Sequence, residues 1–369
     1  MKRLAWLRHV LALVASVAVM LCSRPSALCA DPPINRRWTV GETVLRAGPK
    51  GAFDDVAVKD PTIVEYHGQW HMFYTAKHGG DATTRKTALG YVRASSLAGL
   101  AEAPRTEMES ILGEAIIAPQ LFYFSPQKLW YLIGHRDREQ GRLHRLEPVY
   151  STNADIEDVR GWGKPKVLET GRVARDEFWI DFWIICDEVK AHLFYADHTD
   201  ALYRMETPLS EFPAGFARAK EQLALKASGQ NVVGSWSFHE ASHIYRVKKT
   251  GQYLALLEGA YDHPIRKNYW DSRNRFVFGM VAERLEGPWR RVERDDQFLA
   301  DPRELVLAEG KRPALHQVSH PELIRVGHDQ RLEIEDFKLR MIFQAFDASD
   351  TPDTFDYHAL PWSLYVGRN

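Results

Sequence analysis

The stretch that decides the fold is DPTIVEYHGQWHMFY, residues 60–74. A polar residue, Asp60, heads a run rich in β-branched and aromatic side chains. The pair His67-Gly68 interrupts this run, and a second run of the same kind follows it. Such enrichment on both sides of a glycine turn predicts a β-hairpin.

Four later segments repeat this design, each with a polar head residue, a β-rich run, a turn and a second β-rich run. They are 120–134, 181–197, 240–259 and 322–347, headed by Gln120, Asp181, Glu240 and Glu322. Successive heads are 60, 61, 59 and 82 residues apart. A strong hairpin about every sixty residues, with weaker strands around it, is typical of four-stranded propeller blades. The sequence therefore predicts an all-β, five-bladed β-propeller. A two-sheet sandwich is the competing architecture, but it does not naturally space hairpins so evenly.

The first thirty residues have the pattern of a secretory signal peptide. A basic start precedes the 13-residue apolar run 10–22, and small residues end the segment at Ala30. We expect cleavage near Ala30, which leaves residues 31–369 as a single domain. An uncleaved membrane anchor is the alternative, although the apolar run is short for a membrane span. The mature chain then keeps one cysteine, Cys186, which lies in an apolar run and is expected to be an inert core thiol.

Composition narrows the class of partner. The chain has 48 Lys+Arg and 49 Asp+Glu, so its net charge of −1 gives no general field for nucleic acid. Its 11 Trp, 14 Tyr and 17 Phe favour β-structure and are also the side chains that line carbohydrate-binding clefts. We therefore expect no nucleic-acid partner.

The five head residues have a joint consequence in a propeller. The first strand of each blade lines the central channel, so we expect the heads to meet at one of its ends. Four of the five are carboxylates. A single polar loop residue usually has no chemical role, but a ring of carboxylates either binds a cation or performs acid/base work.

The chain resembles the family 62 glycoside hydrolases, the arabinoxylan-specific α-L-arabinofuranosidases, and more distantly the family 43 enzymes of the same clan. Matching stretches run in order over nearly the whole mature chain. Among them are KDPTIVEYHGQWHMF (59–73), APQLFYFSPQKLWYL (118–132), WIDFWIICD (179–187), FHEASHIYRV (238–247), SHPELIRVGHDQRLEI (319–334) and DYHALPW (356–362).

The resemblance implies an inverting mechanism with three carboxylates. Asp60 corresponds to the family's general base, Asp181 to the aspartate that modulates the acid, and Glu240 to the general acid. The stretch around Glu240 reads Phe238-His239-Glu240-Ala241, with one residue inserted relative to the family's F-E-A. We expect Asp181 to raise the pKa of Glu240 and keep it protonated. Glu258 is the alternative acid.

The resemblance also implies further site residues. His320, in Ser319-His320-Pro321-Glu322, corresponds to a histidine near a channel calcium ion. Calcium prefers oxygen ligands, so we expect mostly water around such an ion. The predicted sugar contacts are Lys59, Gln120, Trp183 and Tyr357.

One strand departs from the family pattern. At 275–280 the chain keeps the first arginine of the family's R-Y-F-R-S-W segment but not the second arginine or the tryptophan. The expected function is a secreted, monomeric arabinofuranosidase that acts on a plant polysaccharide and has no membrane association in its mature form. A β-xylosidase or arabinanase of the same clan is one alternative, and a non-catalytic sugar-binding propeller is the other.

Overall fold

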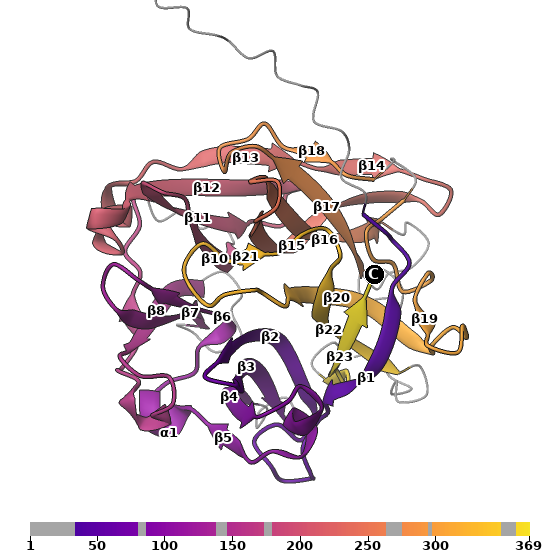
Figure 1. Ribbon diagram of the computed structural model, residues 1–369, viewed down its shortest axis with the longest axis horizontal. Coiled ribbons are helices and arrows are strands. Elements are labelled where there is room, and N and C mark those ends of the chain that lie inside the picture. The colour runs from indigo at the N-terminus through magenta and orange to yellow at the C-terminus, as the bar shows by residue number, and fades with distance from the viewer. Residues whose placement is uncertain are drawn as a thin grey trace, which may run out of the picture. The chain divides into compact units, whose positions relative to one another are not determined.

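The computed structural model describes residues 34–79, 86–137, 146–172, 179–262, 275–293, 297–347 and 359–369. The predicted signal segment and Tyr357 lie outside these residues. Pro33–Asn369 form one compact unit of five β-sheets, so the predicted propeller is confirmed (Figure 1). No helix in the described part of the chain is long and apolar enough to cross a membrane.

The first three blades are regular four-stranded meanders. Blade 1 consists of β2 (Ala57–Tyr66), β3 (Gln69–His78), β4 (Lys86–Ala94) and β5 (Arg105–Glu107). Blade 2 consists of β6 (Ile117–Phe124), β7 (Leu129–Asp137), β8 (Leu146–Asn153) and β9 (Lys166–Val167). Blade 3 consists of β10 (Ile180–Cys186), β11 (Lys190–Ala196), β12 (Ala201–Pro208) and β13 (Gln222–Lys226).

The last two blades are larger. Blade 4 consists of β14 (Ser228–Gln230), β15 (Ser235–Val247), β16 (Tyr253–Asp262), β17 (Arg275–Ala282) and β18 (Arg290–Arg291), with β21 (Glu333–Ile334) paired to β15. Blade 5 consists of β20 (Leu315–Leu323), β22 (Arg340–Asp347), β23 (Ser363–Arg368), β1 (Thr39–Leu45) and β19 (Val306–Leu307). The ring closes in blade 5, because β1 from the start of the domain pairs with β23 from its end.

Within the described residues, helical structure is confined to short connections. The α-helix α1 (Glu109–Leu112) and the 3₁₀ helices η1 (Ala98–Glu102), η3 (Val159–Gly161), η4 (Leu209–Glu211) and η5 (Ala214–Arg218) link strands.

The blades are held together by an aromatic and aliphatic core. Trp38, Phe122, Phe194 and Tyr245 are completely buried, and Cys186 lies in the same cluster as expected. The innermost strands β2, β6, β10, β15 and β20 follow one another around the channel, each in contact with the next. Blades 1 and 4 are therefore separated by one blade on one side and two on the other.

Candidate active site

Each innermost strand carries a bulge at which a non-glycine residue adopts left-handed backbone. These residues are Asp60 (φ +48°), Ala118 (+48°), Asp181 (+57°), Ala241 (+52°) and His320 (+43°). At Asp60, Ala118 and Asp181 the ladder to the next strand is shifted by one extra residue, and around Ala241 by two. The strand β20 has two such shifts, one at Gln317 (φ +62°) and one at His320. Bulges re-aim side chains next to active sites, and non-glycine residues with positive φ are uncommon. The five-fold repetition of this device defines the mouth of the channel.

The positions of the bulges show that only three of the five predicted head residues lie at the channel mouth. Asp60 and Asp181 occupy the turned position itself, and Glu240 directly precedes it. Gln120 and Glu322 lie two residues farther along their strands, where the turned residues are Ala118 and His320. Glu322 is completely buried and accepts a hydrogen bond from the Tyr245 hydroxyl at 2.8 Å. The prediction that Gln120 and Glu322 lie at the mouth of the channel is therefore wrong. The bulges that place Ala118 and His320 there instead have no recognisable signal in the sequence.

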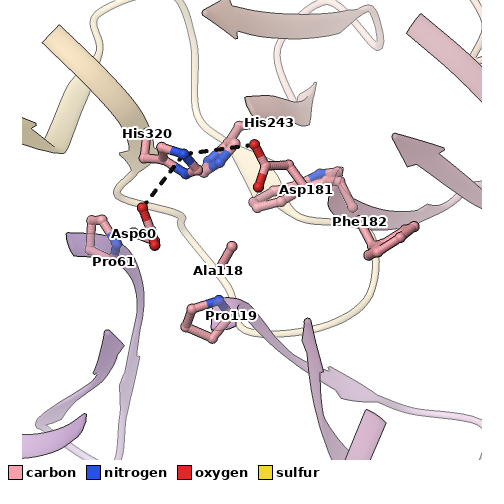
Figure 2. A pocket seen from close by; sticks show the side chains of 9 residues that line it. Asp60, Pro61, Ala118, Pro119, Asp181, Phe182, His243 and His320 are labelled. Carbon is pink, nitrogen blue, oxygen red and sulfur yellow. Dashed lines mark ion pairs between the residues drawn. The ribbon is translucent and has the colours of Figure 1, made fainter. Parts of the chain in front are cut away.

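The three predicted catalytic carboxylates converge on one imidazole. Nε2 of His320 lies 3.5 Å from Asp60 Oδ1, 3.7 Å from Asp181 Oδ2 and 3.9 Å from Glu240 Oε1. Figure 2 shows His320 between Asp60 and Asp181, at a hollow that Ala118, Pro119, Trp183 and His243 also line. Since all three oxygens lie within 4 Å of the same nitrogen, those of Asp60 and Glu240 are at most about 8 Å apart, a separation compatible with inverting glycosidases.

Neighbouring charges keep His320 protonated and Asp60 ionised. Burial lowers the pKa of His320, but the charges of Asp60 and Asp181 outweigh burial and raise that pKa to about 10. Burial raises the pKa of Asp60, but Lys59 and His320 outweigh it and hold that pKa below its ordinary value. At neutral pH His320 is therefore an imidazolium and Asp60 a carboxylate, the form a general base requires.

The pKa of Asp181 is raised and that of Glu240 is lowered, which is the opposite of the prediction for Glu240. Burial, followed by the charges of Glu240 and Asp60, raises the pKa of Asp181 to about 7. Burial also raises the pKa of Glu240, but Arg275 and His239 outweigh it and hold that pKa well below its usual range. The expectation that Asp181 keeps Glu240 protonated is wrong, because it counted one neighbour and left out Arg275, whose charge lowers the pKa of Glu240.

Arg275 is the residue responsible. Its guanidinium donates to Oε1 of Glu240 and to Oε1 of Glu258, and it is almost completely buried. The other oxygen of Glu258 accepts from the Ser319 hydroxyl at 2.5 Å and from the His320 backbone N–H at 3.1 Å. Glu258 thus fixes both Arg275 and the turn that carries His320, which is the work of a positioning residue.

The predicted sugar contacts occupy different layers. Trp183 lines the hollow and stacks on His243, with ring centroids 4.3 Å apart. Lys59 is buried beside Asp60, with Nζ 3.7 Å from Oδ1. Gln120 lies deeper, where its amide donates to the Ile184 carbonyl and accepts from the Ile184 N–H, both at 2.7 Å. That pair of bonds ties blade 2 to blade 3. Whether Lys59, Gln120 and Trp183 touch a sugar stays a prediction.

Two histidines beside Glu240 were not predicted as site residues. Nε2 of His198 lies 3.0 Å from Oε2 of Glu240, and Nε2 of His239 lies 3.7 Å from the same oxygen. His239 is the inserted residue noted in the sequence, which was the available signal. His198 comes from the β11–β12 turn, and nothing in its local sequence marks it.

Fold and site together define a class: five-bladed propellers with a carboxylate cluster at the channel mouth, as glycoside hydrolases use. The sequence profile of glycosyl hydrolase family 62 matches residues 37–366, and the chain belongs to this family. α-L-Arabinofuranosidase C of Cellvibrio japonicus (strain Ueda107) is 26% identical over 335 residues. That alignment covers 90% of this chain and 47% of the relative, so the chain spans about half the relative's length.

Solved structures agree with this assignment. The catalytic domain of the Coprinopsis cinerea family 62 α-L-arabinofuranosidase superposes with a TM-score of 0.74 at 29% identity, covering 90% of this chain and 96% of that one. The Podospora anserina α-L-arabinofuranosidase in complex with cellotriose gives 0.72 at 27% identity, covering 92% and 98%. An α-L-arabinanase from Cellvibrio cellulosa, at 13% identity and a TM-score of 0.54, shares the fold.

Proposed function

We propose that this protein is a secreted, inverting α-L-arabinofuranosidase that removes arabinofuranose side chains from arabinoxylan. Membership of family 62 and the arabinofuranosidase relatives support the reaction class. The observation that carries the proposal is the convergence of Asp60, Asp181 and Glu240 around His320.

Inversion needs a base on one face of the sugar and an acid on the other. Asp60, held ionised by Lys59 and His320, takes a proton from the water that attacks the anomeric carbon. Glu240, two blades away across the channel, gives a proton to the departing oxygen. The new C–O bond forms from the water side as the glycosidic bond breaks, so the anomeric configuration inverts.

Glu240 must receive its proton before it can act as the acid. Two carriers lie within reach: the His320 imidazolium, 3.9 Å from Oε1, and Asp181, whose carboxyl pKa is about 7. Ligand oxygens of Asp181 and Glu240 lie within 4.8 Å of each other. In this proposal Asp181 modulates the acid by exchanging a proton with it, rather than only by raising its pKa.

The proposed substrate is tested by the sugars released from arabinoxylan, arabinan and xylan. Free arabinose from arabinoxylan, with little from linear arabinan and no xylose from xylan, supports the proposal. Arabinose from linear arabinan or xylose from xylan would instead identify an activity of the family 43 kind. Binding without release of any sugar would identify a sugar-binding propeller.

Calcium near His320 remains part of the proposal. Oδ1 of Asp60 and Oδ1 of Asp181 are buried and lack a hydrogen-bond partner in the described part of the chain, and carboxylate oxygens suit calcium. The His320 ring fits less well, because an imidazolium has no lone pair to give. We therefore expect carboxylates and water to hold the ion, with a neutral His320 as a ligand only after it loses its proton. Elemental analysis of protein purified without chelator measures it.

Export is the remaining element of the proposal. We propose cleavage near Ala30 and a soluble, monomeric mature form without membrane association. N-terminal sequencing of the exported protein and light scattering check the two statements.

A further inference from the structure

We propose that His198, His239 and Glu240 form a binding site for a transition-metal dication of the zinc type, and that its occupancy blocks the acid side of the active site. The Nε2 atoms of both histidines and a carboxylate oxygen of Glu240 lie within 4.8 Å of one another. Imidazole and carboxylate donors suit zinc, copper and nickel. The inhibitory consequence rests on the proposed function of Glu240, whereas the binding itself does not.

The distances are close to those of a metal centre. With Zn–N and Zn–O bonds of about 2.0–2.1 Å, tetrahedral ligand atoms lie roughly 3.3 Å apart. Oε2 of Glu240 is 3.0 Å from Nε2 of His198 and 3.7 Å from Nε2 of His239. The two rings lie 4.2 Å apart at an angle of 27°, so small rotations bring both nitrogens onto one ion.

A left-handed turn and a bulge set the backbone positions of the two histidines. His198 has φ +61°, in a turn where Oδ1 of Asp197 accepts from the Thr199 N–H at 2.9 Å and its hydroxyl at 2.6 Å. In β15, Phe238 pairs with Gly259 and Ser242 pairs with Leu257, so this bulge holds two extra residues. The bulges of β2, β6 and β10 each hold one extra residue. Blade 4 thus carries one residue more than blades 1 to 3, and His239, between Phe238 and Glu240, is that residue.

Neighbouring groups fix which nitrogen of His239 carries the lone pair. Arg275 Nη2 lies 3.4 Å from Nε2 of His239, and a guanidinium can only donate. Nε2 is therefore the acceptor nitrogen, and it faces Glu240. The positive charge of Arg275 is shared between Glu240 and Glu258, so these three groups together carry one net negative charge toward an incoming dication.

An entry path exists through His198, whose side chain is 30% exposed. Two other groups are weaker candidates for a zinc-type ion. In the cluster of Asp187, His192 and Glu286, both ring nitrogens of His192 are engaged, by Asp187 at 3.0 Å and by Arg204 at 2.9 Å. The cluster of Asp181, Glu240 and His320 is the catalytic centre already described.

Occupancy has a defined chemical consequence. A metal on Oε2 holds Glu240 as a carboxylate, because ligands bind in their deprotonated form, and His198 binds through Nε2 once its proton sits on Nδ1. Glu240 can then no longer protonate a leaving group.

The test uses the full mature protein in excess calcium, with cobalt as a spectroscopic probe and zinc as its competitor. We expect visible cobalt absorption in the wild type and in the control His67→Ala, which removes an exposed histidine paired with Glu157 elsewhere. His198→Ala and His239→Ala should lose the band and weaken zinc binding by more than about tenfold, the smallest loss typical of outer-shell changes. His198→Cys should retain binding and add a thiolate-to-cobalt band in the near ultraviolet.

Absence of a cobalt band in the wild type, or a band unchanged in His198→Ala, would overturn the proposal. His198 is partly exposed, so its variants are expected to fold even if His239→Ala does not. Zinc should also inhibit sugar release by the wild type and by His67→Ala, and not by His198→Ala. If the protein released no sugar at all, the cobalt result would still decide the metal site, so the two failures are distinguishable.

Discussion

At Glu240 two kinds of neighbour compete for the protonation state. Asp181 favours the neutral acid, whereas Arg275, His239 and His198 favour the carboxylate. Glu240 and Asp60 were identifiable from the sequence because their motifs match a known family. The protonation states were not, because the arginine that decides them arrives from β17, 35 residues away along the chain.

Replacing the two glutamates separates their roles. Glu240→Gln should reduce cleavage of the polysaccharide by about 10²–10⁴-fold, because its alcohol leaving group needs a proton. It should retain much more activity on an aryl arabinofuranoside, whose phenol departs unprotonated. Glu258→Gln, the matched control, should lower both activities together and also the free energy of unfolding, since it loosens Arg275 and His320. Steady-state rates on both substrates check this, and an equal loss on both for Glu240→Gln would place the acid elsewhere.

Two variants should gain stability relative to wild type as pH rises, each over its own pH range. His320 has its pKa raised to about 10, so it stabilises the fold fully below its ordinary value of 6.5, and this contribution is lost as pH rises through 10. The stability gap between wild type and His320→Gln should therefore narrow between pH 6.5 and 10. Asp181 has its pKa raised to about 7, so Asp181→Asn should gain stability relative to wild type as pH rises from 4 to 7. Urea unfolding of chelator-treated protein measures both, and gaps that stay constant with pH would contradict the assigned charges.

At the scale of the strand, the bulge is the device that builds the site. Hairpins, turns and their spacing were readable because β-branched and aromatic enrichment is a local signal. The bulges were not readable, because the left-handed residues are not glycines. They are Asp60, Ala118 and His320, each followed by a proline. Because the bulges could not be predicted, Gln120 and Glu322 were wrongly expected among the residues at the channel mouth.

Ala118 offers a clean test of the left-handed position. With φ at +48°, Ala118→Gly removes the steric cost of a left-handed alanine and should raise the free energy of unfolding by about 1 kcal/mol. The buried Ala88 of β4 has no positive φ, so Ala88→Gly should instead cost about 1 kcal/mol. Denaturant midpoints compare the two, and destabilisation by both substitutions would refute the left-handed bulge at Ala118.

At the scale of the whole molecule, the ring depends on joining its two ends. The evenly spaced hairpins were enough to predict five blades, because each blade is one repeated unit. The closure was not predictable from local patterns, since β1 pairs with β23 across more than 300 residues of sequence. Trp38, just before β1, is completely buried and donates its indole N–H to the Leu299 carbonyl at 2.7 Å.

Trp38 should therefore be a stability hot spot of the closure. Trp38→Ala is expected to cost about 3–5 kcal/mol, because it leaves a large cavity in the core cluster. Trp70→Ala, in the half-buried part of β3, should cost clearly less. Thermal and chemical unfolding compare the variants, and equal losses would mean that the closing strand contributes no special stability.

Proton NMR during the first minutes of reaction shows directly which anomer of arabinose the protein releases from arabinoxylan oligosaccharides. We expect β-L-arabinofuranose to appear first from the α-linked substrate, since Asp60 activates a water on the face opposite the leaving group. Asp60→Asn should release arabinose from neither the oligosaccharide nor an aryl arabinofuranoside. Initial release of the α-anomer would rule out inversion, and substantial hydrolysis by Asp60→Asn would rule out Asp60 as the base.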